Sequence, residues 1–262
     1  MQATLPHLIP GSDLIRNGSS QERSSGALRE KLIVALDVSS AAEAQKIVAA
    51  VGDSVLTFKV GMQLYTAVGP QVVRDLVASG RRVFLDLKYH DIPNTVSLAV
   101  KEAAQLGVSM LTVHTSGGEK MLRAAVDAAR AVNPALMVLG VTVLTSFHES
   151  DLAQIGIPGN IQDEVSLLAR LALKSGCQGI VTSAHEAPGV RAALGADFAI
   201  VTPGVRPAGS GHGDQARVVT PAQAIAAGAT HIVVGRPITE AADPAAEARA
   251  ILEEIRASMM SR

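Results

Sequence analysis

From residue 31 onward the chain repeats one unit: an apolar run rich in Val, Ile and Leu, a polar residue at its end, and an alanine-rich amphipathic stretch. Near-continuous apolar runs are typical of parallel strands that are covered by helices. The predicted strands are 32–37, 55–60, 82–88, 110–114, 137–144, 179–183, 198–202 and 231–235. The predicted helices are 40–51, 63–79, 95–106, 118–132, 161–175, 186–194, 220–227 and 240–258.

Eight such units in roughly 230 residues predict an α/β protein with a single closed (β/α)8 TIM barrel. The alternative is an open doubly wound sheet, which usually has fewer strands and a glycine fingerprint after its first strand. The first predicted strand ends Ala35-Leu36-Asp37-Val38-Ser39 and has no such fingerprint. We therefore expect a barrel and no dinucleotide cofactor.

The predicted barrel domain covers residues 31–262 and leaves the first thirty residues outside it. Residues 1–30 contain clusters of Pro, Gly and Ser and lack the continuous apolar core of a secretion signal. They are interpreted as a flexible N-terminal arm or as an added expression sequence.

The composition argues against several classes of partner. The chain has 23 Lys and Arg against 24 Asp and Glu, so neither nucleic acid nor an anionic membrane is an expected partner. Trp is absent, which argues against surfaces that stack bases. The single Cys177 lies in an apolar segment, as is typical of proteins in a reducing compartment. Because no apolar run approaches the ~20 residues of a membrane span, a cytoplasmic protein is expected.

The third predicted strand carries charges that an apolar strand rarely has. It reads Val83-Phe84-Leu85-Asp86-Leu87-Lys88, and Asp91 follows just past its end. Because alternate side chains of a strand share a face, Asp86 and Lys88 are expected to point the same way, with the three charges crowded together. Buried charges are costly unless they are paired. The stretch is therefore either a satisfied ion-pair network or part of a functional site.

The ends of the other strands favour a functional site, because the active site of such a barrel lies at the carboxyl ends of its strands. The first two strands end in Asp37 and Lys59. Polar residues also end or follow the remaining strands: His114 and Thr115, Thr145 and Ser146, Ser183, Arg206, and Arg236. The acids and lysines on the first three ends exceed the ordinary polarity of strand ends.

The last two connections carry a second group of candidate residues. The segment 203–221 is long and rich in glycine, as is usual for either a lid or a disordered loop, and Arg206 lies near its start. The eighth strand ends in Gly235-Arg236, where glycine lets backbone N–H groups approach an anion. Phosphate sites in these barrels are typically built from the loops after strands seven and eight. We expect Arg206 and Arg236 to bind a phosphate group there.

Lys88 is expected to face this phosphate site from the opposite half of the barrel. Its acidic neighbours favour the ammonium form, which suits proton donation better than Schiff-base chemistry. The site is therefore predicted to donate a proton to a phosphorylated small molecule.

Several segments resemble the orotidine 5′-phosphate decarboxylase family. The most specific is Asp86-Leu87-Lys88-Tyr89-His90-Asp91-Ile92-Pro93-Asn94-Thr95. The similarity extends over Asp37, Phe58-Lys59-Val60-Gly61, Val143-Leu144-Thr145-Ser146, Thr202-Pro203-Gly204-Val205-Arg206, Gly213-Asp214-Gln215 and Gly235-Arg236-Pro237. One departure is Ala208, where some relatives carry a polar residue, so phosphate binding by this loop is expected to rest more on Gln215.

The resemblance implies decarboxylation of orotidine 5′-monophosphate to uridine 5′-monophosphate, the last step of de novo pyrimidine nucleotide synthesis, without a metal ion or an organic cofactor. It implies that Lys88 protonates C6 and that Asp86 lies beside the leaving carboxylate. It also implies a homodimer with shared active sites. The implied catalytic residues are Lys88, Asp86, Asp91 and Lys59, with Asp91 acting across the interface. The implied substrate-binding residues are Asp37, Lys59, Ile92, Thr95, Thr145, Ser146, Arg206, Gln215, Gly235 and Arg236, of which Ile92 and Thr95 also act across the interface.

Two other functions are weighed against this one. The first is a metal-dependent sugar-phosphate decarboxylase, aldolase or epimerase with the same barrel, in which His90, His114, Asp86 and Asp91 are candidate metal ligands. The string from His90 to Thr95 favours the pyrimidine enzyme over it. The second is a non-catalytic phosphate-binding barrel, against which the intact lysine and acids argue.

Overall fold

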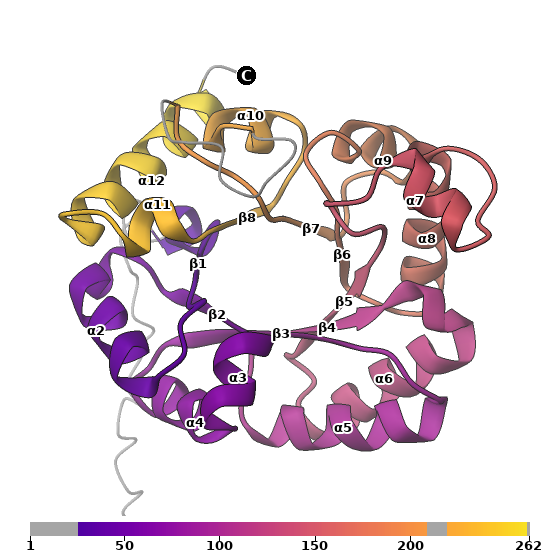
Figure 1. Ribbon diagram of the computed structural model, residues 1–262, viewed down its shortest axis with the longest axis horizontal. Coiled ribbons are helices and arrows are strands. Elements are labelled where there is room, and N and C mark those ends of the chain that lie inside the picture. The colour runs from indigo at the N-terminus through magenta and orange to yellow at the C-terminus, as the bar shows by residue number, and fades with distance from the viewer. Residues whose placement is uncertain (1–25, 209–218, 261–262) are drawn as a thin grey trace, which may run out of the picture.

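Eight parallel strands close into a barrel in the computed structural model, which describes residues 26–208 and 219–260 (Figure 1). Each strand pairs in parallel with the next, and β8 pairs with β1. The predicted (β/α)8 TIM barrel is therefore confirmed. The strands are β1 Leu32–Ala35, β2 Thr57–Gly61, β3 Arg82–Tyr89, β4 Met110–His114, β5 Met137–Val141, β6 Gly179–Val181, β7 Ala199–Thr202 and β8 His231–Val234.

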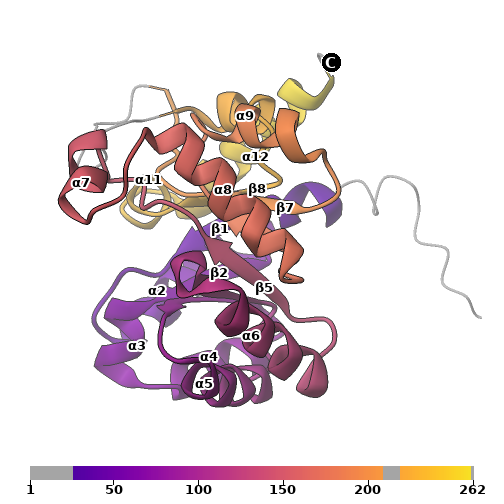
Figure 2. The same cartoon turned by 90° about the vertical axis from the view of Figure 1, so that its right-hand side faces the viewer.

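The helices surround this barrel as an outer layer (Figures 1 and 2). They are α2 Ala41–Val51, α3 Met62–Val68, α4 Gln71–Ala78, α5 Pro93–Gln105, α6 Gly118–Val132, α7 Glu149–Gln154, α8 Ile161–Lys174, α9 Ala187–Leu194, α10 Pro221–Ala226, α11 Arg236–Thr239 and α12 Pro244–Met260, with short 3-10 helices η1 Gly52–Ser54 and η2 Thr115–Gly117. None of the helices formed by the described residues is long and apolar enough to span a membrane.

Two predicted helices differ from the structure and one helix was not predicted, each for a local reason. The predicted helix 63–79 is two helices, because Gly69 ends α3 with a φ of +70° and Pro70 starts the next one. The predicted helix 240–258 starts instead at Pro244, which is well suited to the first turn, and α11 precedes it. Helix α7 was not predicted, since its six residues are too few to show a helical period.

The apolar core has two layers that the strands separate. The larger layer lies between the barrel and the helices, and the smaller one fills the barrel interior with side chains such as Phe84, Met110 and Leu139. Alternation along β3 that places Phe84 in the interior also directs Asp86 toward it, nearer the carboxyl end. The charged residues therefore lie directly above the interior core.

Residues just before β1 contact the barrel. Residues 26–30 are helical, and Leu28 packs against the outer core. Glu30 accepts a hydrogen bond from Arg82 at 2.7 Å, and Arg29 donates one to the carbonyl of Asp53. Most of the predicted arm, residues 1–25, lies outside the described residues, so the domain boundary at residue 30 stays a prediction.

His231, the first residue of β8, makes the stability of the barrel depend on pH. Burial, with the nearby charges of Lys31 and Arg82, lowers its pKa from 6.5 to about 4. Between these values the unfolded chain binds a proton at His231 and the folded chain does not, so stability falls as the pH decreases. From pH 7 to pH 4 this residue is expected to lower the free energy of unfolding by roughly 3 kcal/mol.

A His231→Asn variant tests this expectation, because the Asn amide keeps both a donor and an acceptor near the Thr230 hydroxyl, which lies 2.8 Å from the imidazole Nδ1. Urea unfolding between pH 4 and pH 7 should show a shallower loss of stability in the variant than in the wild type. Equal pH dependence in both proteins would contradict the assignment.

Candidate active site

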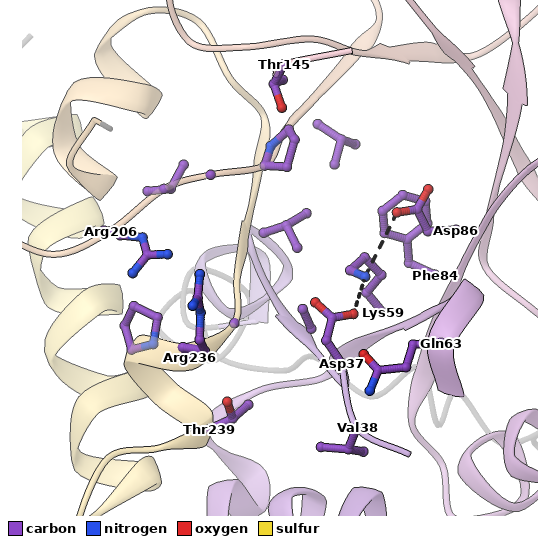
Figure 3. A pocket seen from close by; sticks show the side chains of 18 of the residues that line it. Asp37, Val38, Lys59, Gln63, Phe84, Asp86, Thr145, Arg206, Arg236 and Thr239 are labelled. Carbon is purple, nitrogen blue, oxygen red and sulfur yellow. Dashed lines mark hydrogen bonds and ion pairs between the residues drawn. The ribbon is translucent and has the colours of Figure 1, made fainter. Parts of the chain in front are cut away.

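A row of alternating charges crosses the carboxyl ends of β1, β2 and β3 (Figure 3). The Lys59 ammonium lies 2.8 Å from Asp37 and 4.0 Å from Asp86, and the Lys88 ammonium lies 2.9 Å from the other oxygen of Asp86. The side chains of Lys59 and Asp86 are only 12% and 14% exposed. Such burial requires pairing, and each lysine has a carboxylate neighbour. The structure thus brings together four of the predicted site residues.

Lys88 does not continue β3 as a regular strand residue. It has a φ of +52°, a left-handed conformation that is uncommon for residues other than glycine. Leu85 pairs with Leu111 and Tyr89 with Val113, so four steps along β3 match two along β4. The strand therefore bulges between Leu85 and Tyr89, and this irregularity directs the Lys88 side chain back to Asp86.

Gly61, at the end of β2, leaves room for the lysine of the same strand. A Cβ atom at this position would lie 2.8 Å from the Lys59 ammonium and 3.3 Å from the Asp37 carboxylate. The ion pair of Lys59 and Asp37 therefore occupies the space that any larger residue at position 61 would need.

The charge row forms one wall of a cavity of about 620 Å³. Arg206 and Arg236 lie on the opposite side, from the segments that follow β7 and β8 (Figure 3). The predicted site residues that line the cavity are Asp37, Lys59, Asp86, Lys88, Thr145, Arg206, Gly235 and Arg236. The ammonium group of Lys88 and two guanidinium groups thus line the same cavity.

Other predicted residues lie away from this cavity. Asp91, Ile92 and Thr95 are exposed, and the Asp91 carboxylate accepts a hydrogen bond from the backbone N–H of Ile92 at 2.6 Å. Among the described residues, Lys88 forms an ion pair with Asp86 and none with Asp91. The expected crowding of three charges is therefore wrong within one chain, because Asp91 follows the end of β3, is exposed and does not line the cavity.

Two further expectations lie at the edge of the site. Ser146 is exposed and does not line the cavity, unlike its neighbour Thr145. Gln215 lies outside the described residues, as does most of the predicted lid 203–221. At the base of that segment Val205 and Val219 form an isolated β-bridge.

Two polar residues of the site were missed from the sequence. Thr112, on β4, is fully buried and its hydroxyl donates a hydrogen bond to Asp86 at 3.0 Å. Gln63 lines the cavity and donates a hydrogen bond to Ser39 at 2.9 Å. The signal for Thr112 was its place between Met110 and His114, at an alternate position that a strand directs to the barrel interior.

His114 lies close to the charge row without joining it. Its ring centroid is 5.5 Å from that of His90. Burial and the neighbouring His90 and Lys88 lower the pKa of His114, so its neutral form is favoured. In the described ranges, no three His, Cys, Asp or Glu side chains are grouped so that they could hold a metal ion. The metal-dependent alternative therefore finds no preformed donor set there.

Cys177 is a free, buried thiol. Burial raises its pKa to about 12. The thiol is therefore protonated at neutral pH and acts as a small apolar core residue, as its apolar segment predicts.

The charged residues on both walls of the cavity come from the carboxyl ends of strands or from the segments that follow them. Active sites of α/β barrels are built at the carboxyl ends of the strands, from residues that several strands contribute. The fold and the cavity define an enzyme of the (β/α)8-barrel class.

The chain belongs to the orotidine 5′-phosphate decarboxylase / HUMPS family, whose model matches residues 30–251. A relative named orotidine 5′-phosphate decarboxylase from Afipia carboxidovorans is 51% identical over 227 residues, which cover 87% of this chain and 95% of the relative. A second relative of that name, from Halorhodospira halophila, is 50% identical over 228 residues, covering 87% and 97%. The family resemblance seen in the sequence is confirmed.

A crystal structure of orotidine 5′-phosphate decarboxylase from Lactobacillus acidophilus superimposes on this chain with a TM-score of 0.79. The two chains are 38% identical, and the match covers 86% of this chain and 99% of the other. The similarity of fold therefore extends over nearly the whole barrel.

The space at Gly61 generates a prediction about the Lys59 ion pair. In a Gly61→Ala variant the flexible Lys59 side chain must move, because its ammonium would lie 2.8 Å from the new Cβ. We expect kcat/KM for the decarboxylation reaction of the family to fall by about 10-fold or more, since hydrogen bonds to charged groups contribute about 1.5–3 kcal/mol. The free energy of unfolding should change by less than about 1 kcal/mol, because a flexible side chain relieves the contact.

The matched control is Gly26→Ala, where no atom of the described residues lies within 4 Å of the added Cβ. This variant should keep the wild-type kcat/KM. Wild-type kcat/KM in Gly61→Ala would show that the position of Lys59 is unimportant.

Proposed function

We propose that this chain decarboxylates orotidine 5′-monophosphate to uridine 5′-monophosphate. Membership of the family supports the reaction. The observation that carries it is the pair of Lys88 and Asp86, 2.9 Å apart, which faces Arg206 and Arg236 across one cavity. A substrate that has a phosphate at one end and a reacting carboxylate at the other fits this arrangement of charges.

In the proposed reaction the bond between C6 and the carboxylate breaks, CO2 leaves, and the electron pair stays at C6. The Lys88 ammonium stabilises the developing negative charge and then transfers its proton to C6. Asp86 lies beside the substrate carboxylate before it leaves. The reaction is redox-neutral and Lys88 supplies both charge and proton, so the proposal includes no metal ion or organic cofactor.

The remaining predicted residues bind the substrate in this proposal. Arg206, Gly235, Arg236 and Gln215 contact the phosphate, and Asp37 and Lys59 contact the ribose and support the charge row. Thr145 and Ser146 contact the pyrimidine. Phosphate binding far from C6 provides free energy that can be used in the transition state, so these contacts raise the rate as well as the affinity.

The active enzyme is proposed to be a homodimer in which each site receives Asp91, Ile92 and Thr95 from the partner. These three residues are exposed in the single chain. Ile92, which caps α5, is 67% exposed, and Leu98, within α5, is 57% exposed. Large exposed apolar side chains next to a functional residue favour a protein interface. In the proposed dimer Asp91 therefore belongs to an active site, that of the partner, whereas in the single chain it lies outside the cavity.

The cellular setting completes the proposal. We place the catalytic domain at residues 31–262, the enzyme in the cytoplasm, and its substrate among small nucleotides and not nucleic acids. The near-neutral charge balance and the protonated, buried Cys177 support this setting.

The proposed reaction can be followed by loss of the orotate ultraviolet band after adding orotidine 5′-monophosphate with excess chelator. We expect rapid loss in the wild type and at least a 1,000-fold slower rate, in order of magnitude, in Lys88→Ala, which lacks both the charge and the proton. No loss with chelator, but turnover of a sugar phosphate after a divalent metal is added, would establish the metal-dependent alternative. Ligand binding without turnover under any condition would indicate a non-catalytic barrel.

Shared sites predict complementation between two inactive chains. Lys88→Ala and Asp91→Ala should each be inactive as homodimers, whereas mixed dimers contain one site with both wild-type residues. Mixing the chains should recover up to about a quarter of the wild-type activity, since about half of randomly mixed dimers are mixed and each has one of two sites intact. If each barrel is self-contained, mixing restores nothing.

A further inference from the structure

We infer that Thr112 is a positioning residue that holds Lys88 and Asp86 in the geometry needed for proton transfer. This inference rests on the proposed function, because it assigns the reason for the geometry of its proton donor. Thr112 lies in the middle of β4, next to the bulged end of β3, and it is fully buried.

Because of the bulge in β3, the backbone N–H of Lys88 has no partner in the regular strand pairing with β4. Regular strand pairing stops at Leu85 and resumes at Tyr89, and the N–H of the half-buried Lys88 lies between them. This N–H donates a hydrogen bond to the Thr112 hydroxyl oxygen at 2.9 Å. A side chain of β4 therefore takes the place of the strand pairing and holds Lys88 at its φ of +52°.

The same hydroxyl also orients the carboxylate. It donates its proton to Oδ1 of Asp86 at 3.0 Å, and this oxygen accepts the hydrogen bond from the Lys88 ammonium at 2.9 Å. The three hydrogen bonds close a ring from the Lys88 N–H through Thr112 and Asp86 to the Lys88 Nζ. One hydroxyl thus fixes the backbone and the charged end of Lys88 relative to each other.

Other threonine hydroxyls of the barrel differ from that of Thr112 in their partners. Among the described residues, the buried hydroxyls of Thr57, Thr182 and Thr202 have no hydrogen-bond partner. Threonine is tolerated in these strands for its β-branched shape alone. The hydroxyls of Thr142 and Thr230 do form hydrogen bonds, but they donate to backbone carbonyls. Thr112 differs from both because its hydroxyl joins a backbone N–H to a charged side chain.

Loss of the hydroxyl should affect the reaction more than substrate binding. Lys88 would keep its charge but lose the hydrogen bond from its backbone N–H to Thr112. Asp86 would still accept a hydrogen bond from the Lys88 ammonium but would lose the one from the Thr112 hydroxyl. Arg206 and Arg236, on the other side of the cavity, would be unchanged. The expected result is a lower rate of the chemical step with nearly unchanged affinity for the nucleotide.

The experiment compares Thr112→Val, which keeps the shape and removes the hydroxyl, with Thr112→Ser, which keeps the hydroxyl. The single-turnover rate of decarboxylation of orotidine 5′-monophosphate and the Kd of uridine 5′-monophosphate are measured for each. Thr112→Val should be about 10-fold to 100-fold slower, in line with hydrogen bonds to charged groups, with a Kd within about twofold of the wild type. Thr112→Ser should recover most of the rate.

The matched control is Thr57→Val, which removes a buried hydroxyl that has no partner and should leave both quantities unchanged. A wild-type rate in Thr112→Val overturns the inference, and so does a parallel loss of rate and affinity that Thr112→Ser fails to restore. If Thr112→Val does not fold, Thr112→Ala is measured in its place against the same two outcomes.

The wild-type protein separates this inference from the proposed function. A wild type that does not decarboxylate the substrate refutes the function. Crystal structures of the wild type and Thr112→Val then test the positioning role alone. That role predicts that Lys88 loses its positive φ or its 2.9 Å contact with Asp86 in the variant, and an unchanged geometry refutes it.

Discussion

The site depends on the contacts of one buried group, the Asp86 carboxylate. It accepts hydrogen bonds from the Lys88 ammonium and from the Thr112 hydroxyl, and the Lys59 ammonium lies 4.0 Å from its other oxygen. A carboxylate this deeply placed is costly without partners, so the ends of β2, β3 and β4 must meet around it. Such a buried pair adds little net stability, because desolvation offsets the attraction. Its value lies in the fixed geometry it imposes on Lys88.

The barrel makes that geometry possible by closing the strands over an apolar interior. Phe84, Met110 and Leu139 fill the interior below the charged residues, and the helices cover the outside. Charges above such a core interact more strongly than in water, and their positions do not need to reorganise during the reaction. Meanwhile the arginines that face them come from the opposite segments of the ring, after β7 and β8. Substrate binding and chemistry can therefore be supported by separate parts of one fold.

Much of the fold followed from the sequence because parallel strands buried on both faces leave a continuous apolar signal. The ends of all eight strands lie no more than three residues from their predicted positions, whereas the short helix α7 and the break at Gly69 and Pro70 were not predicted. A six-residue helix has too few turns for a period, and a proline that starts a new helix reads the same as one that bends an old one. Local signals therefore sufficed for the strands and failed where a helix was short or interrupted.

The sequence by itself determined the barrel, the family and the residue types at the strand ends, including Asp37, Lys59, Asp86 and Lys88. These follow from patterns within single segments and from the rule that barrel sites lie at carboxyl strand ends. Only the tertiary structure decided that Asp91 does not line the cavity, that Gly61 leaves space for an ion pair, and that Thr112 holds Lys88. Each of these depends on how one strand is placed against its neighbour. A bulge in β3 changes that placement, and no pattern within a single strand records it.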